Sequence, residues 1–212
     1  MPSPTRPFLG RERELDTLAR ALHECAAGSG SVWLVSGEPG IGKSRLAEEL
    51  ARSAQAAGMV SLDGRCWEAG GAPAFWPWLQ ALRGLVRQLG QAAVDAALGA
   101  RAVHLLPLLP ELAAARPALG STPALDADQA RFQVLEAVTT LLVEASARGA
   151  PILVVLEDLH AADPSSLLLL EFLAREVGRA RLVVLGTYRE SSSTPRRRSR
   201  SRAWHGSRTR CG

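Results

Sequence analysis

Residues 37–44 read GEPGIGKS and have the residue types and the spacing of a phosphate-binding loop. They match the pattern G-x-x-x-x-G-K-[ST] at every fixed position. Residues 32–36 before the loop are apolar enough for a buried strand, and residues 45–52 after it carry leucines at helical spacing. In this context the backbone N–H groups of the loop and of the helix start can surround a polyphosphate. We expect Lys43 to reach the outer phosphates and the Ser44 hydroxyl to hold Mg²⁺. The other candidate nucleotide contacts are Gly37, Glu38, Pro39, Gly40, Ile41, Gly42 and Arg45.

Lys43 is the only lysine among the 25 lysine and arginine residues of the chain. An ammonium group is a compact point charge that fits among phosphate oxygens, whereas arginine presents a planar fork. Lysine at this one position therefore favours a phosphate-binding role over a chance match in a glycine-rich turn.

Glu157 and Asp158 follow directly after the apolar run 152–156. Such a run predicts a buried parallel strand, which delivers both carboxylates to its C-terminal edge, where open α/β sheets bind ligands. One acid can hold the Mg²⁺ shell while the next orients or deprotonates the attacking water. The candidate metal ligands are therefore Ser44, Glu157 and Asp158.

A further apolar run, residues 181–187, predicts another buried strand, and Arg189 lies at its exit. A surface ion pair would also explain an arginine here. The C-terminal end of a strand favours a phosphate-sensing role, so we take Lys43, Asp158 and Arg189 as the candidate catalytic residues.

The elements that must position these groups alternate between strands and helices. Residues 59–63 predict a strand, and residues 65–149 predict a helical insertion between strands of one sheet. Its long helix runs from about residue 126 to residue 148. Asp163 is expected to cap a following helix that has proline in its first position. The side chains of the long helix expected to face inward are Phe132, Leu135, Val138 and Leu142.

Three of the five tryptophans, Trp67, Trp76 and Trp78, fall within twelve residues. They either form an aromatic lid or partner surface, or they anchor a long loop on the core, and the second interpretation is favoured. The leucine and alanine content of the insertion is also compatible with a dimer surface, and the sequence does not decide this.

The charge of the chain is divided unevenly. The formal net charge is +4, yet residues 191–212 hold seven arginines and no acid, and residues 1–190 hold 18 basic against 21 acidic side chains. We therefore do not expect residues 8–190 to bind nucleic acid, while a weak contact through the basic tail stays open. No apolar run approaches the roughly 20 residues of a membrane helix. With no signal-peptide core and three widely spaced cysteines, we expect a cytoplasmic protein with no membrane partner.

Five motifs come in the order seen in one group of proteins: residues 8–15, 37–44, 64–67, 156–166 and 186–189. Over about residues 8–190 the chain resembles the ATPase module of bacterial signal-transducing NTPases of the AAA/STAND type. That module precedes helical repeats and a LuxR-type DNA-binding domain, or accompanies adenylate-cyclase catalytic domains. The resemblance implies an α/β P-loop NTPase fold of the AAA-like kind, with a parallel sheet flanked by helices.

Position by position, the resemblance also implies roles. Glu157 would be the Mg²⁺-linked acid, Asp158 the water-orienting acid, and Arg189 the sensor of the terminal phosphate. The family often has tryptophan where this chain has Ala162, which affects packing more than chemistry. The segment that would lie near the adenine contains Phe8, Gly10 and Arg11.

These observations predict a domain that binds ATP with Mg²⁺ and hydrolyses it slowly, as a switch in signalling or transcription regulation. The alternative is a nucleotide-binding regulatory module with negligible hydrolysis that acts through partner contacts. Beyond ATP, the expected partners are C-terminal effector domains missing from this chain, or separate proteins.

The end of the chain departs from the family. We expect residues 1–7 to be an N-terminal tail, residues 8–190 to be the ATPase domain, and residues 191–212 to be a disordered basic tail. The family continues past the arginine with another strand and a helical lid. The hypothesis from the sequence is therefore a truncated or frame-shifted chain that stops before the lid and leaves one sheet edge unpaired.

Overall fold

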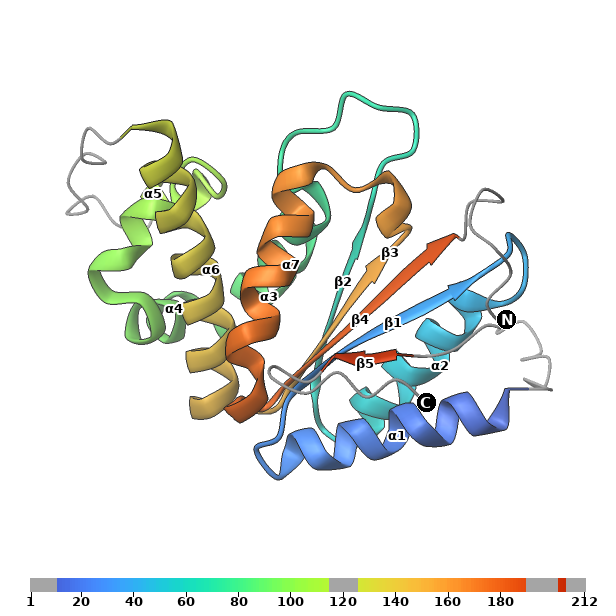
Figure 1. Cartoon of the computed structure of the whole chain (residues 1–212). Coiled ribbons are helices and arrows are strands. Elements are labelled where there is room, and N and C mark those ends of the chain that lie inside the picture. The colour runs from blue at the N-terminus through green and yellow to red at the C-terminus, as the bar shows by residue number, and fades with distance from the viewer. Residues whose placement is uncertain (1–10, 115–125, 190–201, 205–212) are drawn as a thin grey trace, which may run out of the picture.

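The computed structural model describes residues 11–114, 126–189 and 202–204, and in them one five-stranded sheet lies between two layers of helices (Figure 1). The sheet has the order β2-β3-β4-β1-β5. β1, β2, β3 and β4 run parallel to one another, and β5 runs antiparallel to β1. The expected α/β fold with a parallel sheet flanked by helices is confirmed. The strands are β1 (Ser31–Gly37), β2 (Val60–Arg65), β3 (Ile152–Glu157), β4 (Leu182–Arg189) and β5 (Arg202–Trp204).

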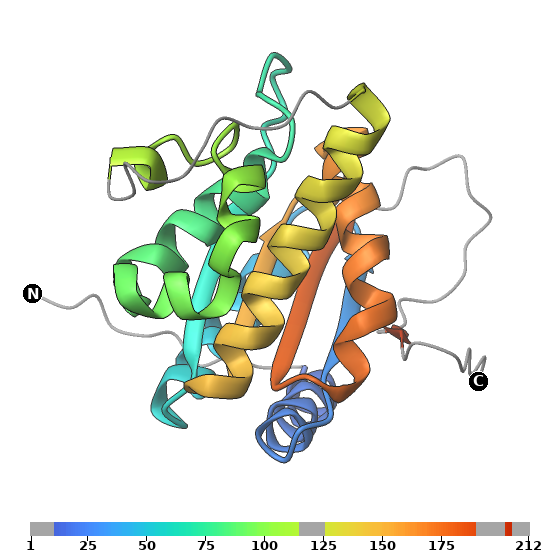
Figure 2. The same ribbon diagram turned by 90° about the vertical axis from the view of Figure 1, so that its left-hand side faces the viewer.

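The inner strands are apolar on both faces because helices cover both faces. In β3, Leu153 and Val155 pack in one core with α1 and α2, whereas Val154 and Leu156 pack in the other core with α3, α6 and α7. Figure 2 shows the long helices of the second layer crossing in front of the sheet. The bounds of these helices are α1 (Glu12–Ala26), α2 (Lys43–Ala56), α3 (Trp76–Leu89), α6 (Ala127–Arg148) and α7 (Pro164–Glu176).

The segment between β2 and β3 is helical, as predicted, and its outer part packs on α6. In this outer part α4 (Gln91–Leu98) and the 3₁₀ helix η1 (Gly99–Leu105) contact α6, and α5 (Glu111–Ala114) follows. Helix α6 begins at Ala127 because the Asp126 side chain accepts a hydrogen bond of 2.8 Å from the Gln129 N–H. Within the described ranges, no helix is both long and apolar enough to cross a membrane.

The inward face of α6 differs from the prediction at one position. Leu135, Val138 and Leu142 are buried as expected, but Phe132 is 52% exposed. Phe132 lies nearer the start of α6, where its ring meets the edge of Phe172 on α7, with the ring centroids 5.6 Å apart. Its aromatic contact is therefore with a half-buried residue of the neighbouring helix α7, at the margin of the core.

The tryptophans of residues 67–78 do not all behave alike: the favoured interpretation, anchoring on the core, holds for Trp78 but not for Trp67. Trp78 is fully buried, and its indole N–H donates to the Ser166 carbonyl oxygen at 3.0 Å, so it anchors α3 on α7. Trp67 is 56% exposed and anchors nothing of that kind. The predicted cap is present, because Asp163 accepts a hydrogen bond from the Ser166 N–H at 3.0 Å and α7 starts at Pro164.

Gly64 lies where β2 passes the start of α3 too closely for a side chain. A Cβ atom on Gly64 would be 1.9 Å from the Pro77 carbonyl oxygen. We expect Gly64→Ala to lower the free energy of unfolding by about 1–3 kcal/mol, measured by chemical denaturation. Gly84→Ala on α3 is the matched control, because its Cβ would meet Leu62 Cδ2 at an ordinary 3.5 Å and alanine favours a helix. Equal losses in both variants would contradict this account.

Part of the basic tail differs from the expected disorder. Residues 202–204 form β5 on the outer edge of β1, with Trp204 opposite Val32 and Arg202 opposite Leu34. The sequence predicted one unpaired sheet edge without naming it, and the outer edge of β1 is paired at these positions. The rest of the predicted tails, at residues 1–7 and over most of 191–212, lies outside the described residues.

Candidate functional site

The loop between β1 and α2 has a backbone that requires glycine. Gly40 and Gly42 have φ angles of +76° and +93°, which are costly for residues with a Cβ atom. A Cβ atom on either would meet nothing within 4 Å, so the backbone angle and not the space demands glycine. Gly42 immediately precedes α2, so the unpaired N–H groups of the first helical turn lie at the loop. The predicted succession of strand, loop and helix is confirmed.

Lys43, the first residue of α2, is buried, with 7% of its surface exposed. Its Nζ atom donates to the carbonyl oxygens of Gly37 and Glu38 at 2.8 and 2.9 Å. Ser44 and Arg45 follow, half-buried, in the first turn of α2. The ammonium group is therefore held inside the loop. The predicted contacts that are exposed are Glu38, Pro39, Gly40 and Ile41.

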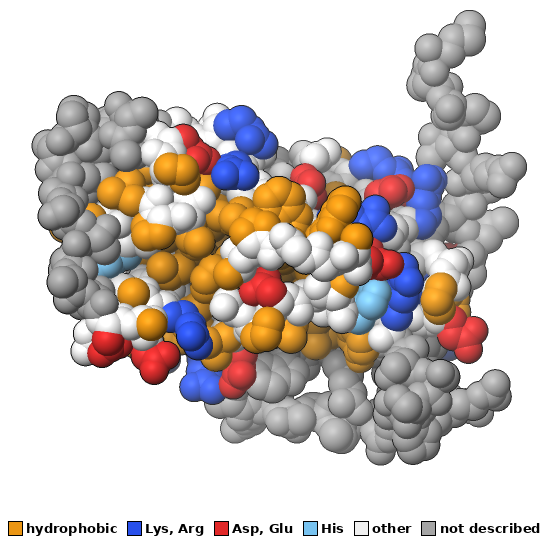
Figure 3. Space-filling model, turned by 90° about the horizontal axis from the view of Figure 1, so that it is seen from above, with side chains coloured by type: hydrophobic (Ala, Val, Ile, Leu, Met, Phe, Trp, Pro, Cys, Tyr) orange, Lys and Arg blue, Asp and Glu red, His pale blue; other side chains and the backbone are white. Residues whose placement is uncertain are grey.

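The sheet register brings the other predicted residues to the same edge. Gly37, where the loop begins, lies opposite Arg189 at the end of β4. Glu157, at the end of β3, lies opposite Arg65 at the end of β2. All four are at the C-terminal ends of parallel strands. Figure 3, which views the molecule from above, shows basic, acidic and histidine side chains gathered beside an apolar strip.

Asp158 is held in one orientation by its neighbours. It is buried, with φ of +59°, and its N–H donates to the Thr187 hydroxyl at 3.2 Å. Its Oδ2 atom accepts a hydrogen bond of 2.9 Å from Arg65 Nε. That hydrogen bond, followed by the charge of Asp158, raises the pKa of Arg65 above its ordinary value. A carboxylate fixed at both backbone and side chain is suited to orienting a water molecule.

Arg65 is itself fastened to α3 through its backbone. The side chain of Gln80 donates from Nε2 to the Arg65 carbonyl oxygen at 2.9 Å and accepts at Oε1 from the Arg65 N–H at 3.4 Å. These two bonds point away from β3, because the next N–H, of Cys66, donates to the Glu157 carbonyl oxygen at 3.0 Å. The end of β2 is thus fixed from both sides.

Glu157 carries a buried oxygen atom that the described residues leave without a hydrogen-bond partner, Oε2. A buried acceptor without a partner costs about 1–3 kcal/mol, so such an atom calls for a ligand. Carboxylate and hydroxyl oxygens are the ligands that Mg²⁺ takes in proteins. The Glu157 oxygen and the Ser44 hydroxyl are thus groups of the kind that Mg²⁺ takes, and their role as metal ligands stays a prediction.

Arg189 contacts an acid that sequence reasoning missed. Its Nη2 atom lies 2.7 Å from Glu68 Oε1, and the same oxygen is 3.4 Å from His160 Nε2. Ligand atoms of Glu68, Asp158 and His160 all lie within 4.8 Å of one another, as in a metal site. Because Arg65 and Arg189 already contact the two carboxylates, we interpret the cluster as an ion-pair network. A phosphate-sensing role for Arg189 stays a prediction.

Four site residues were missed from the sequence: Arg65, Glu68, His160 and Thr187. The prediction ended β2 at residue 63, although the strand continues to Arg65. A continuation of the strand would have placed Arg65 at the same edge as Glu157. Among the residues implied to lie near the adenine, Arg11 is half-buried, and its carbonyl oxygen accepts from the Leu15 N–H at 3.0 Å. Phe8 and Gly10 lie outside the described residues.

Comparison with known proteins identifies the architecture around this site. Residues 7–185 match the sequence model of the AAA ATPase domain. The chain belongs to the AAA ATPase domain family. It is therefore an AAA-type P-loop ATPase module, and such modules bind nucleotide, usually with Mg²⁺.

This AAA ATPase domain also matches a much longer protein. It is 32% identical over 197 residues to an uncharacterized protein of Rhizobium meliloti (strain 1021). The alignment covers 87% of this chain but 19% of that protein. The chain thus spans about one fifth of the length of this relative.

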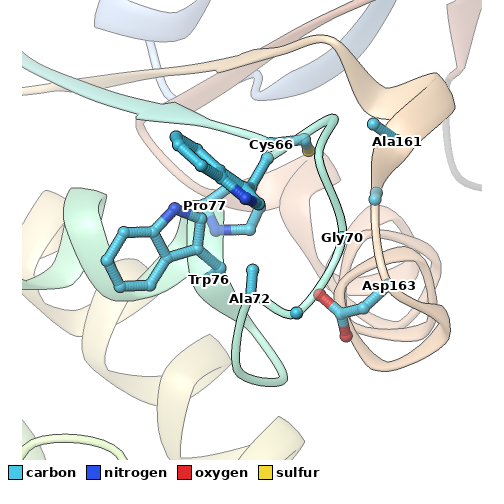
Figure 4. Close-up of a pocket in the computed structure, with 10 residues that line it drawn as sticks. Cys66, Gly70, Ala72, Trp76, Pro77, Ala161 and Asp163 are labelled. Carbon is cyan, nitrogen blue, oxygen red and sulfur yellow. The ribbon is translucent and has the colours of Figure 1, made fainter.

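A pocket of about 140 Å³ lies in the AAA ATPase domain between the segment after β2 and the turn before α7 (Figure 4). In Figure 4, Gly70 and Ala72 lie on one side of it and Ala161 and Asp163 on the other. Burial, with smaller effects of Asp163 and Asp158, raises the pKa of the Cys66 thiol to about 11, so the thiol is protonated at neutral pH. The pocket is lined by Cys66, Trp67, Gly70, Gly71, Ala72, Trp76, Pro77, Ala161, Ala162 and Asp163.

Proposed function

We propose that this domain binds ATP with Mg²⁺ and hydrolyses it slowly, as a switch in signalling. The observation that carries the proposal is the Oε2 atom of Glu157, which is buried without a hydrogen-bond partner among the described residues. Glu157 ends β3 at the edge where β1 leads into the glycine-rich loop. A buried acceptor at this edge favours a ligand there, and family membership supports a nucleotide as that ligand.

Each residue has a role in this proposal. Lys43 exchanges the carbonyl oxygens of its loop for phosphate oxygens. Ser44 and Glu157 hold Mg²⁺, which when bound neutralises charge on the phosphate oxygens. Asp158 accepts a hydrogen bond from the attacking water and takes up its proton, and Arg189 binds the terminal phosphate.

A second function is a nucleotide-binding module with negligible turnover. Two observations favour it, because both groups assigned to hydrolysis are in ion pairs. Asp158 contacts Arg65 at 2.9 Å, and Arg189 contacts Glu68 at 2.7 Å. Burst and steady-state measurements of phosphate release separate the two functions. Continuous release supports hydrolysis, whereas tight ATP binding without release supports the second function.

Glu157→Gln is expected to raise the Mg²⁺ concentration needed for half-maximal ATP binding by roughly 10- to 100-fold. The amide keeps the size of the side chain and removes the charge that attracts the ion. A titration of Mg²⁺ at constant ATP measures the effect. Glu24→Gln, at an exposed position on α1, is the matched control and should behave like the unaltered chain. An unchanged Mg²⁺ dependence in Glu157→Gln would remove this residue from the metal site.

The role as a switch requires something for the domain to act on. We propose effector domains or partner proteins, of the LuxR-type or adenylate-cyclase-associated kind that the resemblance implies. The 19% coverage of the relative supports this, because most of that protein lies outside the aligned domain. The free, buried thiols of Cys25 and Cys66 fit a reducing compartment such as the cytoplasm. The test is the affinity of the purified domain for such an effector domain or partner protein, measured once with ATP and once with ADP. A switch requires the two affinities to differ.

A further inference from the structure

We propose that Glu68 competes with the terminal phosphate of a bound nucleotide for Arg189, so that a triphosphate releases the loop that carries Glu68. This inference rests on the proposed function, because it requires a nucleotide at the loop after β1. It adds a residue that discriminates ATP from ADP and a segment that moves between the two states.

The position of Arg189 gives the first support. Its backbone lies opposite Gly37, the first glycine of the phosphate loop, yet its guanidinium contacts Glu68 at 2.7 Å. Carboxylates and phosphates are recognised by the same fork of arginine N–H groups. The contact with Glu68 therefore uses donors that a phosphate would take.

The strength of the pair gives the second support. The side chains of Arg189 and Glu68 are 40% and 48% exposed. Exposed ion pairs contribute little to stability, since water screens both charges. A phosphate carries more negative charge than one carboxylate, so it can displace Glu68 from Arg189 at little cost.

The surrounding charges give the third support. Ligand oxygens of Glu68 and Asp158 lie within 4.8 Å of each other, where two carboxylates repel unless cations lie beside them. Arg65 contacts Asp158 and Arg189 contacts Glu68, so each acid has its own cation. When phosphate takes Arg189, Glu68 loses this cation and keeps its 3.4 Å contact with His160 Nε2, while Asp158 and the phosphate repel it. Glu68 then moves away from the site.

The loop can make this movement without disturbing the sheet. Glu68 lies between two anchored points, because the Cys66 N–H donates to the Glu157 carbonyl oxygen and the Phe75 N–H donates to Asp163 Oδ1. Between these points Trp67 is 56% exposed. The loop also forms one wall of the pocket in Figure 4, so its release opens that pocket. The fluorescence of Trp67, the residue next to Glu68, should therefore report the movement of the loop.

The first test compares the affinities of variants for a non-hydrolysable ATP analogue and for ADP. Glu68→Gln should bind the ATP analogue about three- to fivefold more tightly and ADP within about twofold of the unaltered chain. Glu171→Gln is the matched control, because Glu171 forms an exposed 2.7 Å pair with Arg175 on α7. It should change neither affinity. In an Arg189→Ala background, Glu68→Gln should have a smaller effect on binding of the ATP analogue, because the competition for Arg189 is gone.

The second test measures the loop by the fluorescence of Trp67. The emission of the unaltered chain minus that of Trp67→Phe should change when the ATP analogue is added and stay constant with ADP. The same subtraction is made in the Glu68→Gln background. There the Trp67 emission without nucleotide should already equal the emission of the unaltered chain with the ATP analogue.

The outcomes separate the two proposals. If the unaltered chain binds ATP and Lys43→Ala does not, but Glu68→Gln leaves both affinities and the Trp67 emission unchanged, the role of Glu68 is wrong and the proposed function stands. If the unaltered, folded chain binds neither nucleotide, both proposals fail.

Discussion

Lys43→Ala is expected to lower the affinity for ATP by roughly 10- to 150-fold while the domain stays folded. The ammonium is buried in the loop, where it donates to the carbonyl oxygens of Gly37 and Glu38. A hydrogen bond between this ammonium and a phosphate oxygen contributes about 1.5–3 kcal/mol. Lys43 is the only lysine of the chain, so no other lysine can replace it. Equilibrium titration with a fluorescent ATP analogue measures the loss.

Lys43→Arg is the matched control for this variant. It keeps the positive charge but replaces a compact ammonium by a planar guanidinium, so we expect an affinity between those of the unaltered chain and Lys43→Ala. Thermal melts followed by circular dichroism check the fold of both variants. A folded Lys43→Ala chain that binds ATP with unchanged affinity would exclude this loop as the nucleotide site.

Asp158→Asn is expected to keep Mg²⁺-ATP binding and to reduce turnover by about 10²- to 10⁴-fold. Asparagine matches the shape of the side chain but cannot take a proton from the attacking water. The orientation should be retained, because Thr187 holds the backbone N–H and the amide oxygen can still accept from Arg65. Steady-state phosphate release at saturating ATP measures the turnover.

Asp63→Asn is the matched control for Asp158→Asn, since Asp63 is an exposed carboxylate on β2. It should hydrolyse ATP at the rate of the unaltered chain. If Asp158→Asn loses Mg²⁺ dependence and Glu157→Gln loses turnover, the roles of the two acids are reversed. If both variants hydrolyse ATP normally, the acids are structural.

The parts of the site that the sequence predicted are those encoded by short, contiguous patterns. The loop before Lys43 has a fixed spacing, and its glycines mark backbone angles that other residues avoid. The acids at 157 and 158 follow a short apolar run that predicts a buried strand, and β3 is that strand. The Asp163 cap depends on a residue three positions later. Such features need no knowledge of distant segments.

The parts that the sequence did not predict depend on contacts between distant segments. Arg65 and Asp158 are 93 residues apart and meet because β2 and β3 are neighbours in the sheet. Glu68 and Arg189 meet because the loop after β2 folds over the end of β4. Phe132 was predicted inward from helical periodicity alone, which does not say how completely a neighbouring helix covers that position. Periodicity assigns a face, and only the assembled layers decide whether it is covered.

Gln80 has a consequence for how copies of this domain behave in concentrated solution. β2 is the outermost strand opposite β5, and an outermost strand offers free N–H and C=O groups to the strand of another molecule. The amide of Gln80 occupies both groups of Arg65, as an adjoining strand would. A foreign strand extending along β2 toward its C-terminal end is therefore stopped before Arg65. Intermolecular β-aggregation is blocked at the end of β2 that carries the site, with no additional strand needed to cover it.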